Sequence, residues 1–595
     1  MNRTTLDPLA PPPPPPTPTL AAPRRSRLEA LNVLDNPIVI QHARARLRLL
    51  PTLSWSLIVL TCVAFIFVLT YYSLTERGAV DPVEAAKAAL LPLIVVQGVL
   101  MMGLGTSAVA TGIARERDQR LLDYHRMSPM TPAAKITGYL FGLPAREYLL
   151  FGLTLPFVGY AVLRGGVEVS KVLHFYVVFF SSVWLYHMTG LMAGMVSRKA
   201  WQSSFISLGL VAGLYLVLPL FARLGLSFFD FLTVRPTFYG MVAQELQQGG
   251  HGTWAQQRLG LISQYQRVPF FGLRLNPTAF SLAVQGFAIA VMYHVVRRKW
   301  IDAGWHPFSR RFALLFVAGL MTLLTGSLWP LVADEDAHAQ LMERLYSSGS
   351  AGVFTLLVGV FAVVCTLTLL LTVSLITANR HTTRRGLRRA WKRGMARPRW
   401  DWDAASSWPA TAAMLAMVAA ASAIVVWAVR SGGIYRVPET VWPWLAAMGG
   451  LLLAVVIAYQ GAYERFGQRA VILSLFVVWV VPVMIMIVLL VAFEDLWRTA
   501  MTLGGLCPAV AGAFCLAAVL DSLTGHVGHT ADLVLSSQAA EDHAHFVIYL
   551  SLSIYAVLAV VMQVLRARFA RRLRRQEYAK SEAADPPPPQ APAAG

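Results

Sequence analysis

The stretch ARERDQRLLDYHRMSPMTPAAKITG, residues 114–138, decides how this chain is organised. It is a polar break between two long apolar runs, and it opens with alternating charges. Glu116 and Arg120 stand four residues apart, so a short amphipathic helix can carry charges on one face. The residue before a proline is pushed out of the helical region, so Ser128-Pro129 and Thr131-Pro132 are expected to end that helix.

Composition places the chain in a membrane. Of 595 residues, 56% are hydrophobic and 14% are charged, whereas soluble domains carry roughly 25% charged residues. The net charge of +20 comes from arginines at the ends of apolar runs, which is typical of the positive-inside rule and excludes nucleic acid as a partner. We therefore expect an all-α, polytopic integral membrane protein.

The apolar runs predict about twelve transmembrane helices, because a span needs about 20 apolar residues. They fall into a first six-span half, residues 36–310, and a second six-span half, residues 311–575. The predicted spans are 51–73, 89–113, 147–163, 172–196, 205–221, 277–296, 311–332, 352–378, 408–430, 441–463, 470–491 and 546–565. Arginine-rich ends orient both termini toward the cytoplasm. The proline-rich residues 1–35 and the tail 576–595 are predicted to be disordered.

Residues 500–521 are apolar enough to span, yet a span here would put the arginines that follow residue 565 outside the cell. Gly504, Gly505, Pro508 and Gly512 instead suit a re-entrant pair of short helices that enters and leaves on one side. Residues 222–276 hold the corresponding position in the first half. Two six-span halves, each with an elaborated outer segment, are therefore expected.

Glu116-Arg117, Leu122-Asp123 and Ser128-Pro129-Met130-Thr131 resemble the E-R…L-E…S/T-P-L-S/T segment of type-2 ATP-binding-cassette (ABC) exporter permeases. In that family this segment is the coupling helix between the second and third spans. Asn36-Pro37-Ile38, followed by three arginines, is similar to the family's interfacial helix. The sequence departs from the pattern at Arg120-Leu121, where the family has Gly-Thr, and at His42, where it has an acidic residue.

The resemblance implies a permease subunit of an ABC exporter that moves an unidentified, amphipathic substrate. No Gly-Lys dipeptide occurs, so the phosphate cradle G-x-x-x-x-G-K-[ST] is absent. The chain is therefore expected to be no enzyme and to hold no cofactor, with ATP and Mg bound by a separate ABC ATPase subunit. It would work as a pseudo-symmetric monomer or a homodimer in the cytoplasmic (inner) membrane of a bacterium.

The resemblance also assigns an ATPase-docking surface in residues 114–138. Its residues are Arg115, Glu116, Arg117, Arg120, Leu121, Leu122, Ser128, Pro129 and Thr131. We expect Glu116 to pair with a basic residue of the ATPase, and Arg117 or Arg120 to pair with acidic ones. Leu121 and Leu122 are expected to pack toward the membrane.

The basic loop Arg380–Arg399 allows two interpretations. It is either a degenerate second coupling helix or a patch that binds anionic membrane lipid, where each arginine contributes about 1 kcal/mol. Because no acidic residue interrupts RRGLRRAWKR, the sequence favours lipid contact.

Two other functions compete with the permease interpretation. Twelve spans in two halves also describe a major-facilitator-like secondary transporter, although no mid-membrane carboxylate is present to couple a proton. A membrane-embedded transferase that uses a lipid carrier would want polar chemistry at a membrane edge. The histidines that could supply it, or bind a metal, are His526, His529, His543 and His545. A solvated histidine-rich loop explains the same residues.

Overall fold

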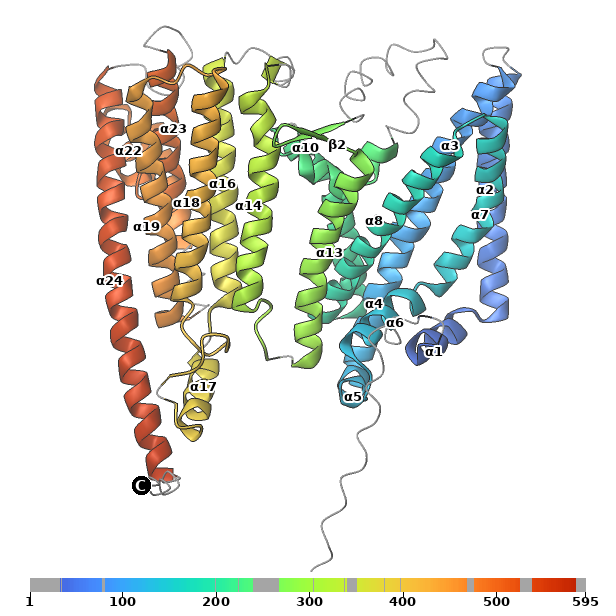
Figure 1. Cartoon of the computed structure of the whole chain (residues 1–595), viewed down its shortest axis with the longest axis horizontal. Helices are drawn as coiled ribbons and strands as arrows, with labels where there is room; N and C mark the ends of the chain where they lie inside the picture. Colours follow the sequence, from blue (N-terminus) through green and yellow to red (C-terminus); the bar gives the residue numbers. More distant parts are fainter. Residues whose placement is uncertain are drawn as a thin grey trace, which may run out of the picture.

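The computed structural model is almost entirely helical (Figure 1). It describes residues 33, 35–76, 81–197, 199–222, 224–238, 267–302, 304–335, 338–339, 350–378, 380–395, 397–467, 476–524 and 538–584. Within these ranges ten helices are long and apolar enough to cross a membrane, or eleven if one bent pair counts as a span. The chain is thus an all-α polytopic integral membrane protein, as its composition predicts.

The first half contains a surface helix, five long apolar spans and a small β-hairpin. Its elements are α1 (Pro37–Arg46), α2 (Leu49–Thr75), α3 (Pro82–Gly98), η2 (Val99–Gly105), α4 (Thr106–Asp118), α5 (Leu121–Met127), α6 (Pro132–Gly142), α7 (Ala145–Arg164), α8 (Val169–Val196), α9 (Ala200–Ala212), η3 (Gly213–Val217), α10 (Leu218–Ala222), η4 (Ser227–Leu232), β1 (Val268–Phe270), β2 (Leu273–Leu275) and α13 (Pro277–Ile301). The segments η2 and η3 are π-helical and lie inside the second and fifth spans.

The second half contains the remaining five long spans. Its elements are α14 (Arg310–Ala333), α16 (Ser350–Ile376), α17 (Arg380–Lys392), α18 (Trp408–Gly432), η6 (Glu439–Val441), α19 (Trp442–Phe466), α21 (Val481–Ala492), η7 (Glu494–Leu496), α22 (Trp497–Gly504), α23 (Pro508–Thr524) and α24 (Gln538–Ala584).

Ten of the twelve predicted spans coincide with the ten long apolar helices. The predicted third span is α7, which carries charged residues at both ends and is less apolar. The predicted eleventh span is a shorter apolar helix, Phe476–Ala492, and its earlier residues lie outside the described ranges. In the predicted re-entrant segment, α22 and α23 are bent by 112°, a bend that such a pair requires.

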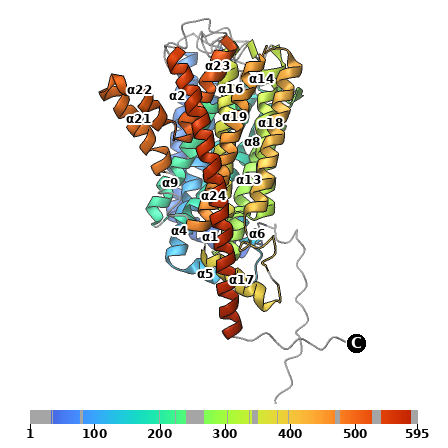
Figure 2. The same ribbon diagram turned by 90° about the vertical axis from the view of Figure 1, so that its left-hand side faces the viewer.

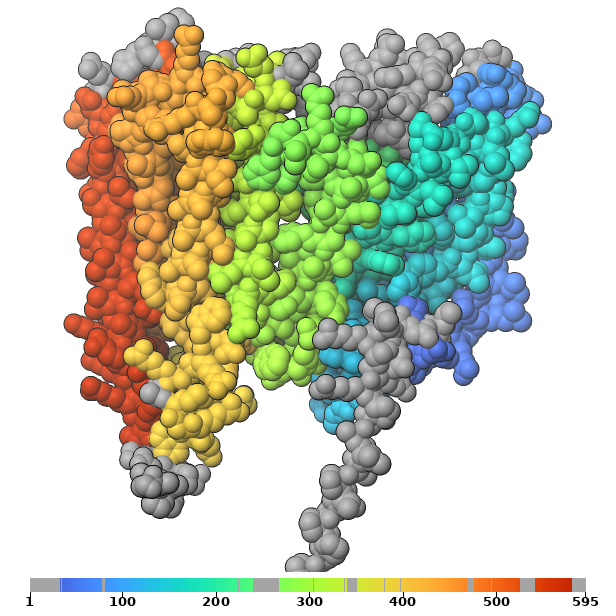
Figure 3. Space-filling view, in the orientation of Figure 1, coloured from blue at the N-terminus to red at the C-terminus, as the bar shows by residue number. Residues whose placement is uncertain are grey.

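The two halves stand side by side, with α2 to α13 in one and α14 to α24 in the other (Figures 1 and 3). Helices α1, α5 and α17 lie at the same end of the bundle as the end of α24 (Figure 1). We call this the basic end, because it carries the arginine-rich segments. Seen from the side, α21 and α22 stand out from the bundle (Figure 2). The outer segments η4, β1 and β2 lie away from the basic end, and residues 239–266 between them are outside the described ranges.

The prediction of a disordered tail from residue 576 is wrong for residues 576–584, which continue α24. This helix has 47 residues, so it is about 70 Å long, more than twice the hydrocarbon thickness. Its last residues are mostly strong helix formers, and Glu577 binds α17 as described below. Residues 585–595, like residues 1–32 of the predicted N-terminal disorder, lie outside the described ranges.

The β-hairpin is hydrogen-bonded to α14 at a carbonyl that Pro330 of α14 leaves free. Pro330 has no N–H, so the carbonyl of Gly326, four residues earlier, loses its helical donor. Phe271, in the turn between β1 and β2, donates its N–H to that carbonyl at 3.2 Å. Gly326 allows this close approach, because a Cβ there would lie 2.3 Å from the Phe270 ring. The outer hairpin of the first half therefore docks on the first span of the second half.

Gly326→Ala is expected to destabilise the protein, because the added methyl overlaps the Phe270 ring and overpacking costs about 1–3 kcal/mol. Gly286→Ala is the matched control, because a Cβ at Gly286 in α13 meets no atom within 4 Å. Thermal unfolding in detergent should show a lower midpoint for the first variant only. Equal midpoints would contradict the docking described here.

Candidate functional site

The predicted coupling segment is two helices rather than one. The span helix α4 continues through Asp118, and Arg120 then adopts a left-handed conformation with φ of 59°. A new helix, α5, begins at Leu121 and ends at Met127. The predicted helix containing both Glu116 and Arg120 is therefore wrong, and the i,i+4 pair does not form. Arg115, Glu116 and Arg117 belong to the last turn of α4.

Glu116 points into the protein, where it is only 7% exposed. Its Oε1 lies 3.0 Å from His42 Nε2 of α1, and its Oε2 accepts a hydrogen bond from the Tyr139 hydroxyl of α6. The prediction that Glu116 pairs with a basic residue of an ATPase is wrong for this structure. Both carboxylate oxygens are engaged inside the protein, where an unpaired charge would be costly.

Arg117 also turns inward. Its Nη1 donates to the carbonyl oxygen of Gly194 at 3.1 Å and to that of Ser197, at the end of α8. The last carbonyls of a helix have no intrahelical donor, and a cation there is favourable. Arg117 therefore stabilises the end of α8, and the pairing of Arg117 or Arg120 with an acidic residue of a partner stays a prediction. Arg115 and Arg120 remain exposed.

Tyr139 joins five elements at the basic end. Besides its bond to Glu116 in α4, its ring lies 5.4 Å from His42 of α1, 6.2 Å from His125 of α5 and 5.3 Å from Trp300 of α13, between centroids. Tyr139 itself is fully buried in α6. Burial, and then the neighbouring Glu116 carboxylate, hold the pKa of its hydroxyl well above the usual value. It therefore stays a neutral donor.

Helix α5 is held on two sides. Leu122 is buried in the apolar cluster that contains Tyr139 and Trp300. On the other side Arg126 pairs with Asp123 at 2.6 Å and donates to the Lys299 carbonyl of α13 at 3.3 Å. Leu121 is 41% exposed and lies outside this cluster, and its packing toward the membrane stays a prediction.

The proline dipeptides end α5 and begin α6. Ser128 is extended, with its hydroxyl donating to the His125 carbonyl at 3.0 Å, and Pro129 follows it, exposed. The side chain of Thr131 accepts the Ala134 N–H at 3.2 Å as the N-cap of α6. Thus Ser128-Pro129 ends a helix as predicted, whereas Thr131-Pro132 starts the next one. Proline suits that first helical position.

A buried lysine caps the end of α5. Lys135 of α6 is 3% exposed, and its Nζ donates to the Ser128 carbonyl at 3.2 Å, with the Arg126 carbonyl 3.5 Å away. Burial lowers the pKa of this amine. The last carbonyls of a helix need such a donor, so Lys135 ties α5 to α6.

Helix α1 braces the same site from the side. Asn36 caps α1 by accepting the Ile38 N–H at 3.0 Å, and it donates to the Ala134 carbonyl of α6 at 2.6 Å. A Cβ at Gly138 would lie 2.8 Å from Ile38, and one at Gly142 would lie 3.0 Å from the α1 backbone. These two glycines let α1 and α6 pack closely. The α4 end, α5 and α6 are therefore one braced unit.

One face of α5 is left uncovered. Leu121, Tyr124 and Met127 are 41%, 68% and 79% exposed, at three-residue spacing along the helix. We call these three residues the docking face. Figure 1 shows α5 below the spans of the first half at the basic end. A rigid, projecting helix with an exposed aromatic and a methionine can bind a partner protein, since aromatic residues and methionine are enriched in interfaces.

The second half presents a helix at the corresponding position. Helix α17 lies between the second and third spans of its half and projects at the basic end beside α24 (Figure 1). Glu577 of α24, 2% exposed, accepts from Arg388 at 2.8 Å and lies 3.4 Å from Arg384. No acidic residue interrupts RRGLRRAWKR, but an acidic partner for two of its arginines comes from α24, so lipid binding stays a prediction. The partner comes from 189 residues away.

Glu577→Ala is expected to loosen α17, because Arg384 and Arg388 lose the carboxylate that ties them to α24. Both arginines are partly exposed, so the loss is closer to that of a surface pair, about 1 kcal/mol or less. Hydrogen exchange of the α17 amides should therefore quicken. Arg385→Ala, at an exposed position of the same helix, is the control. Equal exchange in the two variants would contradict this role for Glu577.

A partly buried ion pair joins the two halves next to α17. Arg298 of α13 donates to both oxygens of Asp403 at 2.8 and 2.6 Å, and Asp403 also accepts the His306 N–H at 3.1 Å. Both contacts come from Nη2 of Arg298, and hydrogen bonds between ionised groups are stronger than those between neutral ones. The loop after α17 is thereby anchored to the first half.

The described histidines of the proposed metal site serve packing. His543 Nε2 lies 3.0 Å from the Thr502 hydroxyl and 2.9 Å from the Arg498 carbonyl. The His545 ring stacks on Trp444 at 4.3 Å. His526 and His529 lie outside the described residues. In the part of the chain that the structure describes, no three metal-ligating side chains come together.

Sequence reasoning missed the residues that brace the site, above all His42, Lys135 and Tyr139. His42 stands where the resemblance expects an acidic residue. In the structure its ring faces the Glu116 carboxylate, so the departure from the family pattern was the signal that could have identified it. Comparison of the chain with protein-family models, with curated proteins and with solved structures finds no match. The geometry and the motif resemblance therefore carry the functional argument.

Proposed function

We propose that this protein is the permease subunit of an ABC exporter, with two permease halves in one chain and the basic end in the cytoplasm. The observation that carries the proposal is the braced helix α5 with its uncovered docking face. The Glu116-Arg117 and Ser128-Pro129 elements of the family segment coincide with the end of α4 and the end of α5.

The bracing supports a mechanical role. A soluble ATPase can move membrane spans only through an element that does not yield when pushed. Helix α5 follows the end of the span α4 after the left-handed Arg120, contacts the span α13 through Arg126, and is capped by Lys135 of α6. A displacement at the docking face would therefore pass to both spans together.

Helix α17 supports a two-site arrangement. ABC ATPases act as dimers, and each half of this chain presents one projecting helix between its second and third spans. The two differ in chemistry, because α5 exposes Tyr124 and Met127 while α17 exposes Arg385 and Arg389. We therefore propose that the two ATPase subunits meet unlike surfaces. The concentration of arginine at this end supports a cytoplasmic location.

The buried carboxylates weigh against a proton-coupled transporter. Such transporters carry ionisable residues deep in their spans. In the described ranges the buried carboxylates are Glu116, Glu147, Asp230 and Glu577. Glu116 ends α4, Glu147 begins α7, Asp230 lies in the outer segment η4, and Glu577 lies near the end of α24. The three glutamates thus lie near helix ends, outside mid-membrane. Asp230 lies deeper, because the carbonyl of the next residue, Phe231, accepts from Gln285 of α13, which also donates to Ser182 at the middle of α8. A permease for an amphipathic substrate, driven by a separate ATPase, remains the proposal.

Purification of the tagged protein from its native host in mild detergent tests the proposal. We expect an ABC ATPase to co-purify, and its ATP hydrolysis to change when the permease is added back. Uptake into inverted vesicles that depends on ATP and persists without a proton gradient would support the same conclusion. Transport that stops when the gradient is collapsed, with no ATPase in the purified complex, would overturn it.

A further inference from the structure

An apolar cavity lies at the seam between the two halves. Near the basic end, α13 and α14 touch, with the His294 and Phe312 rings stacked at 3.7 Å. Farther along, Phe287 and Phe316 stack at 6.1 Å. Beyond these rings α13 and α14 border a cavity of about 320 Å³ that is open along the seam, and the hairpin β1–β2 borders it as well. Figure 3 shows the two helices meeting at this seam.

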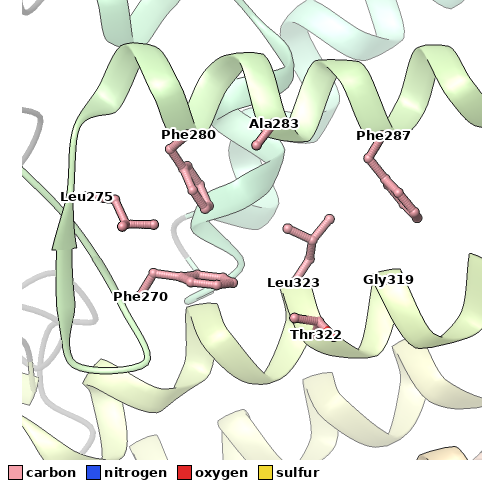
Figure 4. Close-up of a pocket in the computed structure, with 8 residues that line it drawn as sticks. All are labelled: Phe270, Leu275, Phe280, Ala283, Phe287, Gly319, Thr322 and Leu323. Atoms are coloured by element: carbon pink, nitrogen blue, oxygen red, sulfur yellow. The ribbon is translucent and has the colours of Figure 1, made fainter.

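The walls of the cavity are almost wholly apolar. Its lining residues are Phe270, Leu275, Phe280, Ala283, Phe287, Gly319, Thr322 and Leu323 (Figure 4). The one hydroxyl, on Thr322, already donates to the Ala318 carbonyl at 2.9 Å. An aromatic ring lies at each end of the cavity against α14. The Phe287 ring packs on Gly319 and the Phe270 ring packs on Gly326, so closely that a Cβ at either glycine would overlap the ring.

The cavity lies within the hydrocarbon layer. Gly326 and Gly319 are seven and fourteen residues before the end of α14 at Ala333. At 1.5 Å per residue these positions are about 10 and 21 Å below that end. The hydrocarbon layer is about 30 Å thick, so the cavity occupies the region where the distal parts of acyl chains lie.

Size and polarity select the occupant. Water needs two to four polar partners, which these walls do not offer. Over the roughly 11 Å between Gly319 and Gly326 the volume gives a cross-section of roughly 30 Å², too narrow for a helix, which is about 10 Å across. An empty gap would forfeit dispersion contacts along its walls. A single extended hydrocarbon chain needs no polar partner, fits this cross-section and restores the dispersion contacts of the walls.

We propose that this cavity binds one acyl chain of an anionic phospholipid, which enters sideways between α13 and α14. We assign the headgroup contact to Arg274, an exposed arginine of β2 next to the lining residue Leu275. Successive strand side chains point to opposite faces, so the long Arg274 side chain reaches the headgroup outside the cavity rather than within it. A guanidinium forms bidentate bonds with phosphate. The lipid would lie between the outer hairpin and the two spans at the seam, and this proposal does not depend on an ATPase.

Photo-crosslinking tests the site without any partner protein. The purified chain is placed in phosphatidylcholine nanodiscs that contain a little phosphatidylglycerol with a diazirine in one acyl chain. We expect crosslinks on peptides covering residues 280–287 and 319–323. Ala283→Phe, which fills the cavity, should abolish them. Ala290→Phe, seven residues on along the same exposed face of α13, should leave them unchanged.

Further variants keep the test decisive. If Ala283→Phe does not fold, Leu323→Trp fills the cavity from α14 and should give the same loss. Arg274→Gln should remove the preference for phosphatidylglycerol over a phosphatidylcholine probe. Equal labelling of the Ala283→Phe and Ala290→Phe proteins, or labelling confined to other spans, would overturn the acyl-chain site. A preference unchanged in Arg274→Gln would overturn the headgroup assignment.

Discussion

Replacing Tyr124 and Met127 together with aspartate is expected to abolish binding of the proposed ATPase partner to this chain. These side chains are 68% and 79% exposed on α5, so the substitutions leave the fold intact. In an interface, a buried aromatic anchor costs about 2 kcal/mol or more when removed, and a desolvated carboxylate adds to that cost. The two changes together should weaken binding by about a hundredfold or more. Co-purification from detergent and ATP hydrolysis by the complex are the measurements.

A matched control introduces the same charges elsewhere at the basic end. Gln41 and Ala45 are exposed on α1 and four residues apart, and their double aspartate variant should still bind the ATPase. Arg385→Glu with Arg389→Glu probes the second-half helix in the same way. If the Tyr124 and Met127 variant bound fully while the Arg385 and Arg389 variant did not, docking would belong to α17 alone.

Glu116→Ala is expected to destabilise the basic end of the first half by about 1–3 kcal/mol, the cost of leaving buried hydrogen-bonding groups without a partner. The change leaves His42 and the Tyr139 hydroxyl without their acceptor in the interior. Thermal unfolding in detergent should show a much lower midpoint. A charge reversal at Glu116 would thus unfold the site rather than report on docking.

Two comparisons isolate the role of Glu116. Asp123→Ala removes a carboxylate that is 68% exposed and should change the midpoint little. Glu116→Ala and Tyr139→Phe should be strongly non-additive, because they remove partners of one hydrogen bond. Additive effects, or a Glu116→Ala protein as stable as the Asp123→Ala protein, would show that this carboxylate does not brace the site.

Hydropathy was enough to place the spans. The transfer of a long apolar run into lipid depends on the residues of that run alone, so helices such as α2 and α14 begin and end within a few residues of their predictions. The end of α5 at Ser128-Pro129 was predictable for a similar reason. A proline restricts the residue directly before it.

The orientation of charged side chains was not predictable in the same way. An alternating run such as residues 115–118 suits either a solvated helix or the buried end of a span, and local spacing cannot separate them. The orientation of Glu116 and Arg117 depends on partners that are distant in the chain. Glu116 is 23 residues from Tyr139, and Arg117 is 77 residues from Gly194.

The sequence by itself determined that the chain is helical, crosses a membrane many times and breaks at residues 114–138. Tertiary structure alone decided that Glu116 and Arg117 brace the site while Tyr124 and Met127 face outward. It also decided that the chain stays helical through residue 584, where Glu577 meets α17. The physical reason is that hydrophobic transfer is a local property, whereas a buried charge is stable only where folding brings its partner within a few ångströms.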